Sequence, residues 1–344
     1  MATIHFLNVL EGDCNIIQHN SGRVSVIDVS NAYNETDTAA ETAVKNIKNT
    51  VVKKTNFVPD GKINYKQKED PDNPIDYLNK FKIKDIFRFI ITHPDMDHLD
   101  GISDLFSEFT ITNTWDTDNN KELDLKTFPN KYNPDDWKFY TDLRDGKNTN
   151  TKRLTYHAGD SNLYYNEDNI KILCPTPDLV KQANKEGGDI HDLSYVILFT
   201  APKKGGGEWK IIFAGDSHDN TWDYILKNHK AEVTNIDVLF APHHGRGSNR
   251  SYEFLKTLTP SVTLFGNASS EHLAYTCYPK TRLTNNQAGY IVIDIDEERL
   301  LFLVKNKAFA DNYRNKEKRK WGEASLYKQF DAYGLFQINA VKTT

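Results

Sequence analysis

The feature that most constrains this chain is a cluster of polar side chains at the end of an apolar segment. Residues 92–101 read THPDMDHLDG and follow directly after the apolar run IFRFII. Five of these side chains can bind a metal: His93, Asp95, Asp97, His98 and Asp100. Carboxylates that are buried together without a counter-ion repel one another and lose their hydration. The segment is therefore either a solvated loop with a helix cap or a cation site.

The composition limits the classes of function. The chain has 344 residues, enough for one large domain or two ordinary ones, and a net charge of −5, so a polyanion would need a local basic patch. Its three cysteines lie far apart and form no CxxC pair, which fits a reducing compartment and argues against a thiolate zinc site. We find neither a signal peptide nor a membrane span, and we expect a cytoplasmic protein.

Strand-like apolar runs alternate with helical patterns through most of the chain. Strands are expected near residues 3–10, 22–30, 85–93, 169–177, 192–201, 207–217, 236–245, 261–268, 288–296 and 299–304. Helices are expected near residues 38–47, 74–83, 97–109, 221–229 and 249–258. This alternation predicts an α/β fold with at least two sheets. Residues 33–75 and 113–155 are polar and are interpreted as insertions.

Polar residues also flank three other predicted strands. Asp216 follows one strand in AGDSHD, the pair His243 and His244 follows another in APHHGRGS, and His191 precedes LSYVILF. Polar groups at several strand ends can converge on one site, and we expect these to do so. Asp192 could replace His191 in this role, and Asp216 could instead cap the helix that follows it.

The spacing within THPDMDHLDG suggests how two metal ions could be held. In an extended stretch, alternate side chains share a face, so His93, Asp95 and Asp97 would point the same way, and a turn could bring in His98. His93 and Asp95 would then bind one ion, while Asp97 and His98 would bind the other. Imidazole and carboxylate ligands suit zinc, manganese or iron.

The motifs THPDMDHLDG, AGDS and PHHGRGS together resemble the metallo-β-lactamase fold, and within it the ComEC-type competence branch. The segments FLNVLEGDCNII, VSVIDVS and HDLSYVILF extend the resemblance over residues 1–308 without the insertions. It implies an αββα sandwich of two β-sheets flanked by helices, with residues 309–344 as an extension packed on or beside the domain. The membrane-channel part of that branch is absent, so DNA uptake is not implied.

The resemblance also implies roles at a dinuclear centre of two divalent ions, zinc or manganese. The expected metal ligands are His93, Asp95, Asp97, His98, His191, Asp216 and His244. Asp216 would bridge the two ions, which would activate a water molecule. We assign the catalytic roles to Asp97, Asp216 and His243. His243 would face the substrate as proton donor, although the reverse assignment of His243 and His244 remains open.

One substitution in the motif bears on the metal. Asp95 stands where the wider superfamily signature HxHxDH has a histidine, as in the competence branch. An oxygen ligand in place of nitrogen makes the first site harder and favours manganese over zinc.

Four further residues are candidates for binding the substrate. Arg246 and Arg250 flank the HHG turn and are placed to hold a phosphate, with help from Ser248. His272 lies in a region where the competence branch carries a histidine near its site. His218 is interpreted as a surface or supporting residue.

These features support three hypotheses of function. The first is a metal-dependent phosphodiesterase, foremost a nuclease acting on DNA. The second is hydrolysis of a small phosphodiester, such as a cyclic nucleotide or a phosphorylcholine ester, in a pocket walled by residues 33–75 and 113–155. The third is a module that keeps the fold but binds a partner protein in a defence or toxin system. Fold alone does not decide between these functions. An open basic trough across the metal site would favour nucleic acid as the substrate.

Overall fold

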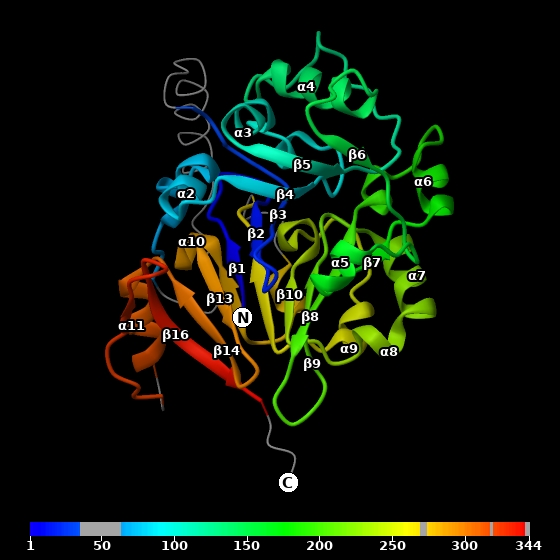
Figure 1. The fold of residues 1–344 in the computed structure, drawn as a ribbon. Helices are drawn as coiled ribbons and strands as arrows, with labels where there is room; N and C mark the ends of the chain where they lie inside the picture. The colour runs from blue at the N-terminus through cyan, green and yellow to red at the C-terminus, as the bar shows by residue number, and fades with distance from the viewer. Residues whose placement is uncertain (35–62, 269–273, 317–318, 341–344) are drawn as a thin grey trace.

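The computed structural model describes residues 1–34, 63–268, 274–316 and 319–340 (Figure 1). The predicted helix at 38–47, most of the predicted insertion 33–75 and His272 lie outside these residues. No helix in the described part of the chain is long and apolar enough to cross a membrane.

Two β-sheets form the centre of the molecule. The larger sheet has the order β15-β16-β14-β13-β1-β2-β3-β4-β5-β6, and the smaller has the order β12-β11-β10-β9-β8-β7. The strands of the larger sheet are β1 (Ala2–Phe6), β2 (Asn15–Gln18), β3 (Val24–Ile27), β4 (Asp85–Ile90), β5 (Thr110–Trp115), β6 (Lys152–Leu154), β13 (Ile291–Ile295), β14 (Arg299–Val304), β15 (Leu326–Tyr327) and β16 (Ala332–Asn339). Those of the smaller sheet are β7 (Ile170–Cys174), β8 (Val196–Pro202), β9 (Glu208–Phe213), β10 (Val238–Phe240), β11 (Val262–Phe265) and β12 (Arg282–Thr284).

The helices lie outside the two sheets. They are α2 (Pro74–Lys80), α3 (Ile102–Glu108), α4 (Pro134–Arg144), α5 (Leu163–Glu167), α6 (Pro177–Ala183), α7 (Asp219–Asn228), α8 (Lys230–Val233), α9 (Phe254–Leu258), α10 (Asn285–Ala288) and α11 (Lys307–Asn315). Apolar side chains of α2, α3 and α4 pack on one face of the larger sheet, while α7 and α9 pack on the smaller sheet. In Figure 1, α3 and α4 lie by β5, and α7 and α9 lie beyond β8 and β9.

Alternation along the strands produces these layers. In β9, Trp209, Ile211 and Phe213 lie in the core between the sheets, whereas Ile212 lies in the core beneath α7 and α9. Successive side chains of a strand point to opposite faces, so an apolar strand serves two cores at once. The α/β class with two sheets flanked by helices, predicted from the sequence, is confirmed.

Parallel strands place the loops that carry the predicted ligands. β3, β4, β5 and β6 run parallel in the larger sheet, and β9, β10, β11 and β12 run parallel in the smaller sheet. The loops after β4, β9 and β10 therefore leave their sheets from the carboxyl ends of parallel strands. Ligand sites in α/β proteins commonly form at such ends.

Two segments contribute more structure than the sequence patterns indicated. Residues 113–155, interpreted as an insertion, hold the second half of β5 together with α4 and β6, and extend the larger sheet by parallel pairing. Many core positions of this segment are aromatic or polar, so the regular spacing of apolar residues that identifies strands and helices is weak there. The tail after residue 308 adds β16, which pairs with β14 in the same sheet.

The segment 113–155 is also fixed to α3, which starts just after the THPDMDHLDG motif. The buried Asp136 carboxylate accepts hydrogen bonds from the backbone N–H groups of Gly101 (2.9 Å) and Ser103 (3.0 Å). It thereby satisfies two donors that the first turn of a helix leaves without partners.

We predict that Asp136→Ala lowers the free energy of unfolding by about 2–4 kcal/mol, because two backbone donors at the start of α3, one buried and one partly buried, lose their acceptor. The matched control Asp135→Ala removes an exposed carboxylate at the start of the same helix and should cost less than about 1 kcal/mol. Urea denaturation followed by circular dichroism measures both. Equal effects of the two variants would contradict this role of Asp136.

Candidate metal centre

The predicted ligands converge between the two sheets. His93 follows β4, and Asp97 and His98 lie in the short helix η2 (Met96–His98). Asp216 follows β9, and His243 and His244 lie in η4 (Pro242–Gly245) directly after β10. His191 lies in η3 (Ile190–Leu193), ahead of β8. Their side chains form overlapping groups of potential metal ligands.

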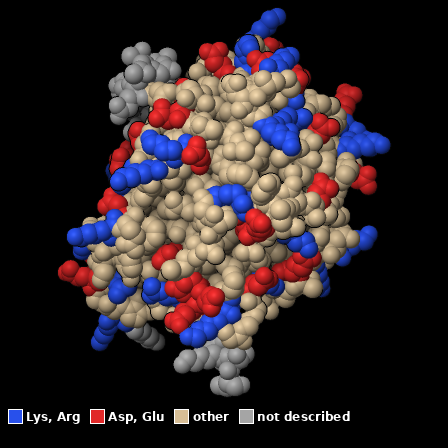
Figure 2. Space-filling view, viewed as in Figure 1, with Lys and Arg blue, Asp and Glu red and all other residues tan. Residues whose placement is uncertain are grey.

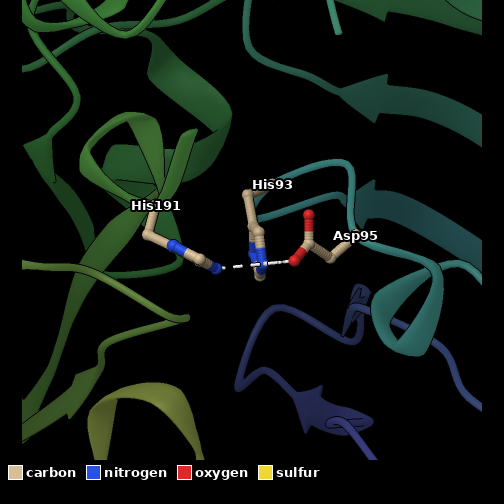
Figure 3. Close-up of side chains that lie close together, drawn as sticks. All are labelled: His93, Asp95 and His191. Carbon is tan, nitrogen blue, oxygen red and sulfur yellow. Dashed lines mark ion pairs between the residues drawn. The ribbon is translucent and has the colours of Figure 1, made fainter. Parts of the chain in front are cut away.

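One group, called site 1 here, contains His93, Asp95, His191 and His243. Asp95 Oδ2 lies 3.7 Å from His93 Nε2 and 3.4 Å from His191 Nε2. Figure 3 shows these three side chains pointing toward one another. Asp216 Oδ2 completes the group, at 3.7 Å from His93 Nε2 and 3.5 Å from His243 Nε2.

The second group, site 2, contains Asp97, His98 and His244. His244 Nε2 lies 3.6 Å from Asp97 Oδ2 and 3.3 Å from His98 Nε2. Asp216 Oδ1 lies 3.3 Å from His98 Nε2 and 3.5 Å from His244 Nε2. The two oxygens of one carboxylate, Asp216, thus face two different ligand groups.

The spacing of these atoms fits metal coordination. Four ligands at about 2.0–2.1 Å from a tetrahedral cation lie roughly 3.3 Å from one another. The separations of 3.3–3.7 Å around Asp216 are close to this value and long for charge-assisted hydrogen bonds. In addition, His93 Nε2 and Asp216 Oδ1 are buried and have no hydrogen-bond partner. Buried polar atoms without partners are costly, so the ligand set fits a cation.

The opposite nitrogen of each imidazole is held by a neighbouring polar group. His98 Nδ1 lies 2.8 Å from Asp28 Oδ2, and His244 Nδ1 lies 3.1 Å from Asp13 Oδ1. His191 Nδ1 lies 2.9 Å from Asp189 Oδ1. A proton on Nδ1 that bonds to these acceptors leaves the Nε2 lone pair directed into the centre. Such outer partners fix the tautomer and orientation of metal-binding histidines.

The backbone contributes through close approaches and unusual turns. His243 and His244 have φ values of 53° and 54°, in the left-handed region that ordinary residues rarely occupy. This turn directs both Nε2 atoms into the centre. Gly12 passes so near η2 that a Cβ at this position would lie 1.7 Å from the backbone oxygen of Asp97. No other residue fits there without displacing the ligand loop.

The electrostatics of the centre call for added positive charge. Burial disfavours the charged form of Asp216, but the surrounding imidazoles hold its pKa well below the usual range. Burial likewise disfavours the charge of His244, yet Asp216 and Asp13 raise its pKa to about 10. Without a cation, protons on imidazoles balance the carboxylates. Because a metal must displace these protons, its affinity should rise with pH.

His243 differs from the other histidines. Burial lowers its pKa to about 3, although Asp216 opposes this shift. Its Nε2 faces Asp216, and its Nδ1 lies 3.1 Å from Ser248 Oγ and 3.4 Å from His218 Nε2. The sequence predicts that one histidine of the pair binds metal and that the other faces the substrate. In the structure both Nε2 atoms point into the centre, one toward each site.

The predicted substrate-binding residues lie in different surroundings. Arg246 is half-buried, and Ser248 is exposed beside His243. Arg250 is buried, and its guanidinium donates to the backbone carbonyls of Ser217 (2.8 Å) and Asp216 (3.3 Å). These two contacts hold the Asp216 loop. His272 lies outside the described residues.

Two residues that contact the predicted ligands were missed from the sequence, and one alternative ligand lies away from the centre. Asp189 bonds both His191 and His218, at 2.9 and 2.6 Å, and was not singled out from the sequence. Lys121 pairs with Asp95 Oδ1 and was also missed. Asp192, the alternative to His191, accepts from Asn220 and from the backbone of Thr221 at the start of α7, away from the centre.

The similarity of this chain to known proteins is distant. No protein-family model and no curated protein matches the chain. Among solved structures, the chain is similar to a metallo hydrolase from the hyperthermophilic archaeon Ignicoccus hospitalis, with 12% identity, 86% of this chain and 100% of that chain covered, and a TM-score of 0.44. A diphosphatase of the PhnP family has 10% identity, with 77% of this chain and 86% of that chain covered, and a TM-score of 0.37. A long-form RNase Z from yeast has 10% identity, with 79% of this chain and 38% of that chain covered, and a TM-score of 0.36.

We predict that Mn²⁺ or Zn²⁺ raises the melting temperature of the protein, because a ligand that binds only the folded chain stabilises it. Asp216→Asn should lose most of this shift, since the amide lacks the charge shared by both sites. The control Asp223→Asn changes an exposed carboxylate on nearby α7 and should keep the full shift. Scanning fluorimetry with and without metal measures all three proteins. A normal metal shift in Asp216→Asn would rule out a shared ligand at this position.

Proposed function

We propose that the chain is a metal-dependent hydrolase that cleaves a phosphodiester at a dinuclear centre. The observation that carries this proposal is the orientation of Asp216, whose Oδ2 faces site 1 and whose Oδ1 faces site 2. A carboxylate shared in this way is the natural bridge between two cations. The resemblance of the ligand motifs to the ComEC-type branch supports the same assignment.

The residues present would hold the two ions as follows. Site 1 would use His93, Asp95, His191 and His243, while site 2 would use Asp97, His98 and His244. When bound, two divalent ions lower the pKa of a water molecule and polarise a phosphoryl oxygen. The oxygen ligand Asp95 makes site 1 harder than it would be with a histidine at this position, and supports manganese as its preferred ion.

The chain's own residues would bind and orient the ester. Arg246 follows the ligand turn of η4, is half-buried and has no acidic partner among the described residues. A guanidinium can hold two oxygens of a phosphate in one plane. Ser248 adds a hydroxyl beside His243. Arg250 keeps the Asp216 loop in place through its two carbonyl contacts.

Two substrate classes remain within this proposal. DNA is the first, because the ComEC-type branch that the motifs resemble is associated with DNA degradation. A small phosphodiester is the second, and the surface charge favours it. Figure 2 shows Lys and Arg interspersed with Asp and Glu over the visible face, with no continuous basic track. The net charge of −5 also makes broad polyanion binding unfavourable.

The test is hydrolysis of bis-p-nitrophenyl phosphate, a cyclic nucleotide, and single- and double-stranded DNA with Mn²⁺, Mg²⁺ or Zn²⁺. We expect metal-dependent cleavage that Asp216→Asn reduces by about a thousand-fold, as expected for loss of the group that positions the ions. Asp223→Asn should retain full activity. Cleavage of DNA would support a nuclease, and cleavage of small esters alone would support the second class. Absence of all cleavage in metal-loaded protein would refute the proposal.

A further inference from the structure

Lys121 extends from the segment between β5 and α4 to the metal centre. Its ammonium forms an ion pair with Asp95 Oδ1. The other oxygen of the same carboxylate, Oδ2, faces His93 Nε2 and His191 Nε2 in site 1. A single carboxylate group therefore separates this ammonium from the position of a cation in site 1.

The backbone around Lys121 is held from several sides. Its carbonyl accepts a hydrogen bond from Arg144 Nη1 at 2.6 Å, and its N–H donates to Asn119 Oδ1 at 3.2 Å. The neighbouring Asn120 N–H donates to Asn184 Oδ1 at 3.1 Å. The Lys121 side chain is 21% exposed, so it lies at the rim of the centre and not beneath it. These contacts fix the backbone at Lys121, and the ion pair with Asp95 places its ammonium.

The ammonium has hydrogen-bonding capacity left over. A lysine side chain carries three N–H donors. Among the described residues, Asp95 is the one acceptor that the Lys121 ammonium contacts. Two donors are therefore available on this partly exposed side chain, beside site 1.

We infer that Lys121 is a substrate-binding residue that donates to a non-bridging oxygen of the phosphoryl group bound at site 1. This inference rests on the proposed phosphodiester function and extends it, because it gives the segment 113–155 a part in substrate recognition. Lys121 would bind the phosphoryl group from this segment, and Arg246 would bind it from η4. The class of ligand is a phosphate monoanion or dianion, free or esterified.

The competing interpretation is that Lys121 only positions Asp95 as a metal ligand. In that case its removal would change metal binding first and phosphate binding only as a consequence. The two roles are separable, because metal content and phosphate affinity can be measured independently on the same variant.

The experiment uses the full chain loaded with Mn²⁺ and compares Lys121→Met, Lys121→Arg and the control Lys126→Met, an exposed lysine of the same segment. Metal content is measured by mass spectrometry, and inorganic phosphate affinity by calorimetry. We expect unchanged metal content in all three variants. Lys121→Met should weaken phosphate binding about ten-fold, the size of one lost charge-assisted hydrogen bond. Lys121→Arg should restore most of the affinity, and Lys126→Met should behave as the parent.

Two results would overturn the inference. Phosphate affinity in Lys121→Met equal to that of the parent would exclude contact with the anion. Loss of metal in Lys121→Met, in parallel with loss of phosphate, would assign the residue to positioning Asp95.

Phosphate binding is measured without turnover, so the result is independent of the activity assay. Weakened phosphate binding in Lys121→Met, in a protein that cleaves no phosphodiester, would support the inference while refuting the proposed function. Cleavage of a phosphodiester with unchanged KM and phosphate affinity in Lys121→Met would support the function and overturn the inference.

Discussion

The rest of the centre depends on one buried carboxylate that has to serve two groups of ligands. Asp216 lies at the end of β9, with both oxygens among imidazole nitrogens of the two sites. An ionised carboxylate that is 2% exposed is stable only if positive charge lies close to it. Protons on His98 and His244 can supply that charge, and two cations would supply it more fully. The burial of Asp216 is thus linked to occupation of the centre.

The sheets and their loops make this burial possible. The ligands come from the larger sheet through β4 and from the smaller sheet through β8, β9 and β10, so the centre exists only when the two sheets are packed together. Carboxylates from further loops, such as Asp13 and Asp28, then fix the imidazoles. Arg250 holds the Asp216 loop by donating hydrogen bonds to the backbone carbonyls of that loop. These outer contacts restrict the positions that the imidazoles and the Asp216 carboxylate can take.

Much of the centre could be predicted because its residues are close in sequence to strand ends. The motif around His93, Asp216 and the His243–His244 pair could be assigned to one site on the single assumption that those strand ends converge. Arg250 could not be placed in the same way, because a long side chain near a site can turn toward backbone carbonyls as readily as toward a ligand. Lys121 lies 26 residues from Asp95, and nothing in its local pattern indicates the contact. The parallel pairing of β5 beside β4 brings the two segments together.

The most direct test of the shared role of Asp216 is crystallographic. Crystals grown with Mn²⁺ and measured near the manganese absorption edge locate each ion by its anomalous signal. We expect two anomalous peaks, one between His93, Asp95 and Asp216 Oδ2, the other between Asp97, His98, His244 and Asp216 Oδ1. A single peak that does not contact Asp216, or no peak within the cluster at saturating Mn²⁺, would contradict it.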